Sequence, residues 1–318
     1  MKIGRVLRAA VSALCALGFA AGAASAQVVG IGTTKGGANA AIGAAIAKVV
    51  SDSAGFQMRP QKMGGTQQYM PVVDAGELEF GLSNVMQYGM AVDGTGMSEG
   101  VEHGNLRLVA TLMQFRNGVV VGRNSGIDSL ADLKGKRVPA GYSAAPLFAV
   151  FMDAFLASAG LGPDDVEQVP VVGLPQSWDA FKQGLVDCTI IAAGAGPLRE
   201  MEATIEGGVK YVPAIDNEIA RGKLPRTRFE VIEPNEASVA LREPTLLNVY
   251  EYVVFANASV PDETVRAVVE AIWQNEEDLR ASSPLWKTYD PKNIARDFGL
   301  AYHPGAVAFY RDQGLWNR

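Results

Sequence analysis

The sequence has little cysteine and histidine, with two residues of each among 318. Neither His103 nor His303 has a second metal-ligand type at zinc-finger or H-E-x-x-H spacing, so the familiar zinc motifs are excluded. Cys15 lies in an N-terminal segment that we expect to be cleaved, which leaves Cys188 without an intramolecular disulfide partner. The fold must therefore be held by its core, in which we predict Cys188 to be a small buried residue.

Runs of basic residues are also absent, and 28 Lys and Arg are outnumbered by 34 Asp and Glu. Nucleic acids and anionic membrane surfaces require a positive footprint, so we expect neither as a partner. The charged fraction is only 19%, whereas 48% of the residues are hydrophobic, which excludes a disordered chain. A chain of this length and composition suffices for two ordinary cores.

The N-terminus has the pattern of a secretory signal peptide. Three basic residues among the first eight precede an Ala-rich apolar segment that ends in the small residues 24–26. We expect residues 1–26 to be removed, so that a periplasmic protein with a net charge of −9 begins at Gln27. A lipoprotein signal at Cys15 is disfavoured because Leu14 occupies a position that requires a small residue. No later apolar run reaches the length of a membrane span, so we expect no stable membrane insertion.

Short apolar strands alternate with helical patterns along the mature chain. Strands are predicted over 28–32, 78–82, 118–122, 138–140, 169–172, 186–192 and 252–256, and long helices over 147–158 and 260–282. This order indicates an α/β fold with parallel strands, whose ends lie along one edge of the sheet.

Glycine and hydroxyl residues follow the predicted strands in five loops. Helix N-termini present unpaired N–H groups and a partial positive charge, so several that converge on one cleft form an anion site for which a carboxylate is the natural ligand. Any one loop alone is equally well explained by helix capping. The loops comprise Thr33, Thr34, Lys35, Gly36 and Gly37; Gly64, Gly65, Thr66 and Gln67; Ser83 and Asn84; Tyr142, Ser143 and Ala144; and Gly194, Ala195 and Gly196.

The motifs of common enzymes are incomplete. The segment 141–145 lacks the closing glycine of a G-x-S-x-G elbow, and the segment 30–35 lacks both the third glycine of a dinucleotide fingerprint and the G-K-[ST] of a P-loop. We therefore predict a protein that is not an enzyme and uses no cofactor and no metal.

Three groups of residues carry a resemblance to a known family. They are Ile31-Gly32-Thr33 with the glycines that follow and Gly64-Gly65-Thr66; the segments 75–81 and 124–138; and the segment 253–262 with His303-Pro304-Gly305-Ala306. Over residues 27–314 the chain resembles the TAXI family, the solute-binding proteins of TRAP (tripartite ATP-independent periplasmic) transporters.

The resemblance implies a bilobal periplasmic-binding-protein type II fold, in which two α/β lobes are joined by two crossover strands with a ligand cleft between them. It places lobe 1 at 27–121, lobe 2 at 122–236, and the return to lobe 1 at 237–318. It also implies a monomer that captures a small organic acid, such as a glutamate-like carboxylate, and docks on the TRAP membrane permease subunits. The implied ligand contacts are Thr33, Thr34, Lys35, Gly36, Gly37, Gly65, Thr66, Gln67, Ser83, Asn84, Tyr142, Ser143, Ala144, Gly194 and Ala195.

Departures from the family pattern fall in these loops, so the resemblance does not identify the ligand of this protein. One hypothesis is that Lys35 adds a positive charge and Tyr142 an apolar wall, which suits a carboxylate with a hydrophobic body. The alternative is that Lys35 points to solvent. Arg116 either clamps a second carboxylate or lies at the hinge without contacting the ligand.

Three other functions remain open. The chain could serve as the receptor of an ATP-driven importer for sulfonates or pyrimidine precursors, because such receptors share the segment 129–136. It could also present its ligand to a membrane sensor. An exported enzyme is the third alternative, but the sequence supplies no base, nucleophile or metal set for it.

Overall fold

The computed structural model describes residues 28–234 and 239–316, so the predicted signal peptide 1–26 and the boundary near Ala237 lie outside the described residues. The strands are β1 (Val28–Thr34), β2 (Gln57–Met63), β3 (Phe80–Asn84), β4 (Leu106–Gly122), β5 (Arg137–Gly141), β6 (Glu167–Val171), β7 (Cys188–Ala192), β8 (Val209–Val212), β9 (Arg228–Ile232) and β10 (Thr245–Asn257). The α-helices are α1 (Gly37–Ser53), α2 (Thr66–Asp74), α3 (Val85–Asp93), α4 (Leu147–Ser158), α5 (Leu174–Lys182), α6 (Gly196–Thr204), α7 (Glu218–Lys223), α8 (Asp262–Gln274), α9 (Glu276–Ser282) and α10 (Pro304–Asp312). Short 3₁₀ turns are η1 (Gly96–Ser98), η2 (Leu130–Leu133), η3 (Pro163–Asp165), η4 (Pro284–Thr288) and η5 (Pro291–Asn293).

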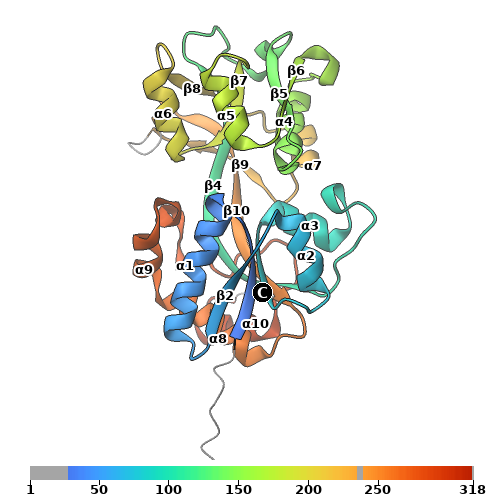
Figure 1. Cartoon of the computed structure of the whole chain (residues 1–318), viewed down its shortest axis with the longest axis vertical. Helices are drawn as coiled ribbons and strands as arrows, with labels where there is room; N and C mark the ends of the chain where they lie inside the picture. The colour runs from blue at the N-terminus through green and yellow to red at the C-terminus, as the bar shows by residue number, and fades with distance from the viewer. Residues whose placement is uncertain (1–27, 235–238, 317–318) are drawn as a thin grey trace, which may run out of the picture.

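Two α/β lobes are joined by the long strands β4 and β10 (Figure 1). Lobe 1, the lower one, contains β1 to β3, helices α1 to α3 and the C-terminal helices α8 to α10. Lobe 2, the upper one, contains β5 to β8 and helices α4 to α7. The predicted fold class, two α/β lobes joined by two crossover strands, is confirmed.

The main sheet is mixed, whereas the sequence pattern predicted parallel strands. Its order is β2-β1-β3-β10-β4-β7, with β8 paired to β4 and β9 to β10, and β5 and β6 form a separate parallel pair. The pairs β1–β2 and β1–β3 are parallel, but β10 is antiparallel to β3, β4 and β9. The reason is that β4 carries the chain into lobe 2 and β10 brings it back beside β4.

The two crossover strands are paired through the hinge. Asn117 lies opposite Asn248, Arg116 opposite Val249 and Gln114 opposite Glu251. The strand predicted over 118–122 is only the C-terminal end of the 17-residue β4. The predicted lobe boundary at Val121 falls near this end and remains a prediction.

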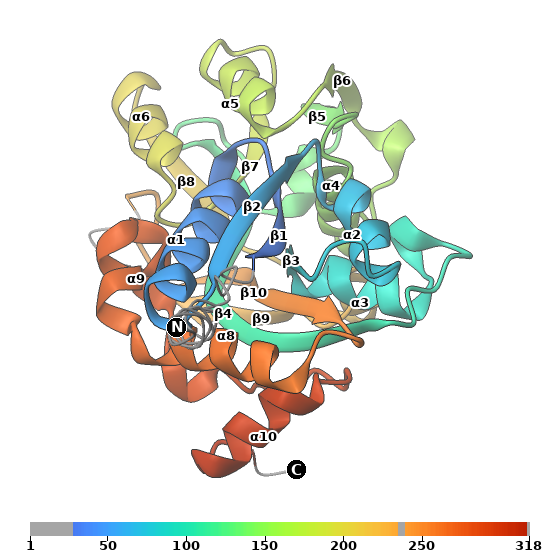
Figure 2. The ribbon, with the colours of Figure 1, turned by 60° about the horizontal axis from the view of Figure 1, so that its bottom comes forward.

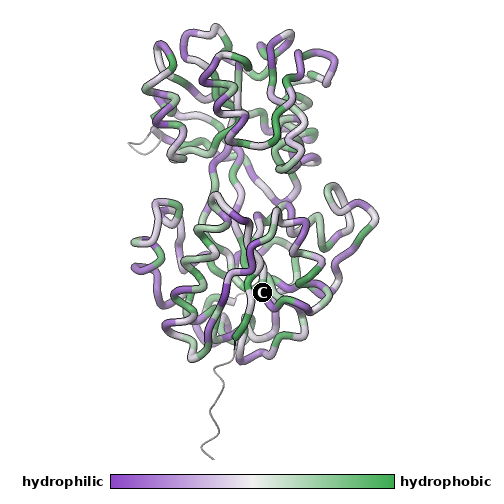
Figure 3. The backbone as a smooth tube through the Cα atoms, viewed as in Figure 1, coloured by the Kyte–Doolittle hydropathy of each residue, from purple (hydrophilic) through white to green (hydrophobic). Residues whose placement is uncertain are grey.

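Hydrophobic segments occur in both lobes, as Figure 3 shows. In lobe 1, Ile42 and Ile46 of α1 are fully buried against the sheet, and Figure 2 shows α8 and α9 beside α1. Lobe 2 has a second core cluster that includes Phe181, Leu198 and Leu247. Cys188 is buried in β7, as predicted, and burial raises the pKa of its thiol. Of the helices described, none is both long and apolar enough to cross a bilayer.

The long helix predicted over 260–282 is in fact two helices separated at Asn275. The Asn275 side chain donates a hydrogen bond of 2.7 Å to the Ala271 carbonyl, which competes with the helical backbone bond at that position. Three acidic residues then occupy the first turn of α9, where they stabilise a new helix start.

Candidate functional site

A cavity of about 720 Å³ lies between the lobes beside the crossover strand β4. Its lining comes from residues 114–116 at the hinge, residues 192–196 and Arg199 of lobe 2, and the η4 segment of lobe 1. The η4 segment is fixed to the edge of β4 by two hydrogen bonds. The Thr288 hydroxyl accepts one of 3.1 Å from the Gln114 N–H and donates one of 3.0 Å to the Gln114 carbonyl. The arrangement is a cleft with walls from both lobes.

The strand ends of the two lobes face this hinge. In lobe 1, Asn84 at the end of β3 is paired with Tyr252 of β10, only a few residues from the hinge pairs. In lobe 2, Ala192 at the end of β7 is paired with Asn117 of β4. The loops that follow these strands therefore lie on opposite sides of the interlobe gap.

Most helices that begin at these loops have no side-chain cap. Gly36, Gly65 and Ala195 are the N-cap residues of α1, α2 and α6, and none of them accepts a capping hydrogen bond through its side chain. The first N–H groups of α1 and α2 are thus left for a ligand or for water, whereas α6 offers only the Gly196 N–H because Pro197 has none. The exception is α3, where Asn84 accepts a hydrogen bond of 2.8 Å from the Gln87 N–H. Thr66 is the first residue of α2, so it does not occupy the N-cap position.

A buried hydrogen-bond network organises the lobe 1 face. Asn39 of α1 accepts a hydrogen bond of 2.8 Å from the Thr34 N–H and donates one of 2.9 Å to the Tyr69 hydroxyl. That hydroxyl in turn donates to the Leu82 carbonyl at 2.5 Å. Burial raises the pKa of Tyr69 to about 12, which keeps the hydroxyl protonated and able to donate. Asn39 thereby links β1, α2 and β3, a role that the sequence analysis missed.

The predicted ligand contacts fall into two groups. Lys35, Gly36, Gly37, Gln67, Ser143, Ala144 and Gly194 are exposed, Thr34, Gly65 and Ala195 are partly exposed, and Thr33, Thr66, Ser83 and Asn84 are buried. Among the described residues, the hydroxyls of Thr33 and Ser83 have no hydrogen-bond partner. Only Gly194 and Ala195 of the predicted contacts line the cavity of about 720 Å³. The role of all these residues in binding remains a prediction.

The structure corrects the hypothesis that the Tyr142 ring forms a wall of the cleft. The side chain of Tyr142 is fully buried in lobe 2, where its hydroxyl lies 3.3 Å from Ser177 Oγ. Tyr142 also has a φ of 45°, after Gly141 at 84°, so the backbone turns sharply there. The turn directs the ring inward, so that the backbone of this loop and the exposed residues Ser143 and Ala144 are left for a solute.

A row of aromatic side chains passes through the hinge, and the sequence analysis missed it. The Phe115 and Tyr250 rings stack with centroids 5.7 Å apart, and Phe115 also contacts Tyr252 at 5.0 Å. Phe151 continues the row into lobe 2, with its ring 5.4 Å from that of Tyr250. Phe115 and Tyr250 are cross-strand partners in β4 and β10, so the pairing of two distant segments was needed to find them.

Arg116 lines the cavity, and Arg199 and Lys287 join it there. Arg116 was predicted from the sequence as a possible clamp, whereas Arg199 and Lys287 were not predicted. Arg199 lies on α6 and Lys287 on η4, segments 88 positions apart that only the fold brings together. Lys35, the cation expected at the site, is exposed and is not part of this lining.

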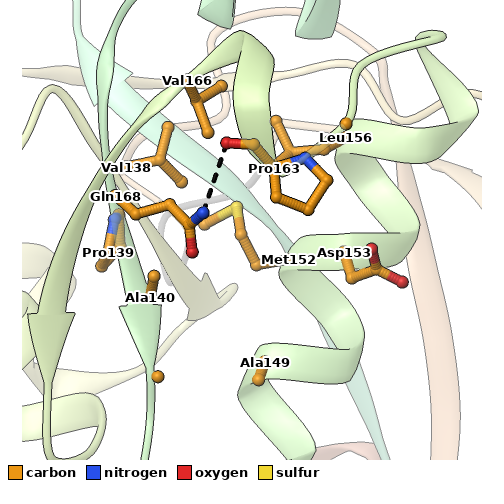
Figure 4. Close-up of a pocket in the computed structure, with 12 residues that line it drawn as sticks. Val138, Pro139, Ala140, Ala149, Met152, Asp153, Leu156, Pro163, Val166 and Gln168 are labelled. Atoms are coloured by element: carbon orange, nitrogen blue, oxygen red, sulfur yellow. Dashed lines mark hydrogen bonds between the residues drawn. The ribbon is translucent and has the colours of Figure 1, made fainter.

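Two further cavities lie away from the hinge. One, of about 180 Å³, lies in lobe 2 between β5, β6 and α4, and Figure 4 shows its mostly apolar lining of Val138, Met152, Leu156 and Val166. The other, of about 420 Å³, lies beside α2 and η1 and includes Gln67. In the part of the chain that the structure describes, no three His, Cys, Asp or Glu side chains are placed to hold a metal ion.

Comparison with known proteins identifies the family of this chain. The sequence profile described as the NMT1-like family matches residues 31–314. The chain belongs to the NMT1-like family. A Haemophilus influenzae protein named for thiamine biosynthesis is 36% identical over 205 residues, which is 63% of this chain and 61% of that relative. The aligned region thus spans less than two thirds of the relative's length.

Solved structures of solute-binding proteins share the fold of this family member. A TctC solute-binding protein from Polaromonas matches with a TM-score of 0.57 at 13% identity, over 92% of this chain and 98% of that one. MatC from Rhodopseudomonas palustris, solved with bound malate, matches with a TM-score of 0.54 at 16% identity, over 91% and 96% of the two chains. At these identities the likeness establishes the two-lobed architecture.

Proposed function

We propose that this chain is a periplasmic solute-binding protein, not an enzyme, that captures a small organic anion between its lobes and delivers it to a TRAP-type membrane transporter. The observation that carries the proposal is the set of uncapped helix starts, α1 and α2 in lobe 1 and α6 in lobe 2, on the two sides of one hinge. Such starts bind anions through backbone N–H groups. Malate in MatC indicates that this fold accommodates an organic acid of that size.

The predicted export signal supports a periplasmic location, and in this proposal the protein works there as a monomer with a membrane permease. A second candidate is the receptor of an ATP-driven importer for a pyrimidine precursor, favoured by the name of the Haemophilus influenzae relative. The neighbouring genes test this choice. A permease with a dozen or more hydrophobic spans supports the first candidate, and a P-loop ATPase supports the second.

Ligand binding to residues 27–318, after unfolding and refolding to remove any bound solute, tests the function. We expect an organic acid to raise the melting temperature by a few degrees at about 100 times its Kd, since this stabilises the folded state by about 2.7 kcal/mol. A response to a neutral pyrimidine and to no acid would support the second candidate. No response to either class would contradict a role in binding these solutes.

A further inference from the structure

Among the described residues, three cationic side chains and no carboxylate line the cavity between the lobes. Arg116 comes from the crossover strand β4, Arg199 from α6 of lobe 2, and Lys287 from η4 of lobe 1. None of the three forms an ion pair with another described residue. We call this cavity, with its three cations, the cationic recess.

Arg116 is the cation that the fold holds most firmly. Its carbonyl accepts a hydrogen bond of 2.7 Å from the Ala193 N–H, so the backbone at this position is fixed between β4 and the end of β7. Its Nε atom is inaccessible to solvent and has no hydrogen-bond partner among the described residues. A buried charged donor without a partner costs free energy, which an incoming acceptor would recover.

The remaining donors come from opposite sides of the gap. The N-terminal end of α6, whose N-cap is Ala195, adds a partial positive charge and the uncapped N–H of Gly196 on the lobe 2 side, since Pro197 has no N–H. Lys287 approaches from lobe 1 on a segment held in place by Arg280, which donates a hydrogen bond of 2.8 Å to the Lys287 carbonyl. Like charges on two lobes repel one another, and an anion placed between them turns that repulsion into attraction.

We propose that the cationic recess is an oxyanion subsite, which takes one end of the captured solute and draws the lobes together on it. The group it accepts is a carboxylate, a sulfonate or a phosphate, and a doubly charged end binds more tightly than a singly charged one because three cations face it. This inference rests on the proposed solute-binding function and adds the residues that hold the charge. It also explains why no carboxylate in the described part of the chain pairs with Arg116 or Lys287.

Sulfate is the probe for the recess, because it is a dianion with tetrahedral oxygens. The full mature chain is titrated with sodium sulfate and, separately, with sodium chloride at equal ionic strength, and melting temperatures and calorimetric affinities are recorded. We expect sulfate to stabilise the wild-type protein more than chloride does. Arg116→Met and Lys287→Met should each weaken sulfate binding about tenfold or more, as expected for loss of a charge-assisted contact.

Two matched variants control for the change in net charge. Arg59→Met and Lys292→Met each remove an exposed cation outside the recess and should leave sulfate affinity within about twofold. Arg199→Met, at an exposed position, tests the recess in case the partly buried Arg116 is needed for folding. The proposal is overturned if sulfate and chloride act equally on the wild-type protein, or if the recess and control variants lose affinity equally.

Parallel titrations with organic acids, their amides and sulfonates separate this proposal from the proposed function. An acid that binds the wild-type protein and Arg116→Met equally well would overturn the subsite and leave the function standing. Sulfate binding that depends on Arg116, without a response to any organic anion, would overturn the proposed solute class and support the subsite. A preference for carboxylates, sulfonates or phosphates at equal charge identifies the group that the recess accepts.

Discussion

Arg296 donates a hydrogen bond of 2.8 Å to Glu251, a carboxylate in the crossover strand β10 with only 2% of its side chain exposed. Arg228 of β9 donates to the same Glu251 oxygen at 2.5 Å. Arg296 belongs to the lobe 1 segment after η5, whereas β9 pairs with the lobe 2 half of β10. One buried carboxylate therefore ties a segment of each lobe to the hinge.

Glu251→Gln should lower the free energy of unfolding by about 1–3 kcal/mol, because two arginines lose the charge they pair with in a buried position. Urea unfolding measures the change. Glu230→Gln is the matched control, since Glu230 pairs with the same Arg228 but has 40% of its side chain exposed and should cost less than about 1 kcal/mol. Equal losses for the two variants would contradict a special role of Glu251 at the hinge.

The His-Pro-Gly-Ala segment at 303–306 has a structural explanation. His303 caps α10 by accepting a hydrogen bond of 3.2 Å from the Gly305 N–H, and Pro304 occupies the first turn. A Cβ atom at Gly305 would lie 2.2 Å from the Asp262 carbonyl oxygen, which is backbone and cannot move aside cheaply. Glycine is required because α10 starts in contact with the start of α8.

Gly305→Ala should therefore destabilise the protein by about 1–3 kcal/mol, the usual cost of forcing an extra group into a packed site. Gly222→Ala is the control, because no atom lies within 4 Å of a Cβ there. That variant should be neutral or gain up to about 1 kcal/mol, since alanine is the better helix former. Chemical denaturation of both variants makes the comparison, and a Gly305→Ala protein as stable as wild type would contradict the close contact.

Stability should fall in mildly acidic solution because of His303. Burial lowers the pKa of His303 below 6.5, and the attraction of the Asp262 carboxylate does not cancel this effect. The unfolded chain then binds the proton more readily than the folded one, so stability is fully present above pH 6.5 and is lost as the pH falls through the folded-state pKa. His303→Asn keeps a capping side chain and removes the titration. As the pH falls from about 8 to about 5, the melting temperature should decline less for this variant than for wild type. Parallel curves for the two proteins would contradict the assignment of the pH dependence to His303.

Much of the fold was predictable from local sequence pattern. The strand over 78–82 and the helix over 147–158 combine clear periodicity with breakers, and the structure places elements there. The mixed sheet was not predictable, because strand direction depends on the pairing of β4 with β10 across more than a hundred residues. The break at Asn275 depends on a single side-chain hydrogen bond, which periodicity does not register.

The candidate site likewise has a part that was predictable from the sequence and a part that was not. Gly36, Gly65 and Ala195 were found as parts of loops that start helices, since glycine and hydroxyl residues at strand ends are local signals. The orientation of Tyr142 was not predictable, because it depends on a φ of 45° and on a buried space beside Ser177. Lys287 was missed because its segment reaches the cleft only through contacts with β4.

A charge placed at the start of α1 tests whether this helix faces the solute. Gly36 is exposed, has the extended backbone of an N-cap residue, and has no atom within 4 Å of a Cβ position. Gly36→Asp should raise stability by about 0.3 kcal/mol through capping, and it should weaken binding of an anionic solute about tenfold because the carboxylate occupies the same N–H groups.

Gly36→Asn is the neutral control. It caps the helix as well as aspartate does but adds no charge, so any loss of affinity that is larger for Gly36→Asp is electrostatic. Calorimetric titration with the acid found for the wild-type protein, at low and at high salt, makes the measurement, and the difference between the two variants should shrink at high salt because screening weakens repulsion. Equal affinities for wild type and Gly36→Asp would mean that the start of α1 lies outside the binding site, and the proposed contacts of lobe 1 would then have to be sought at α2 and β3.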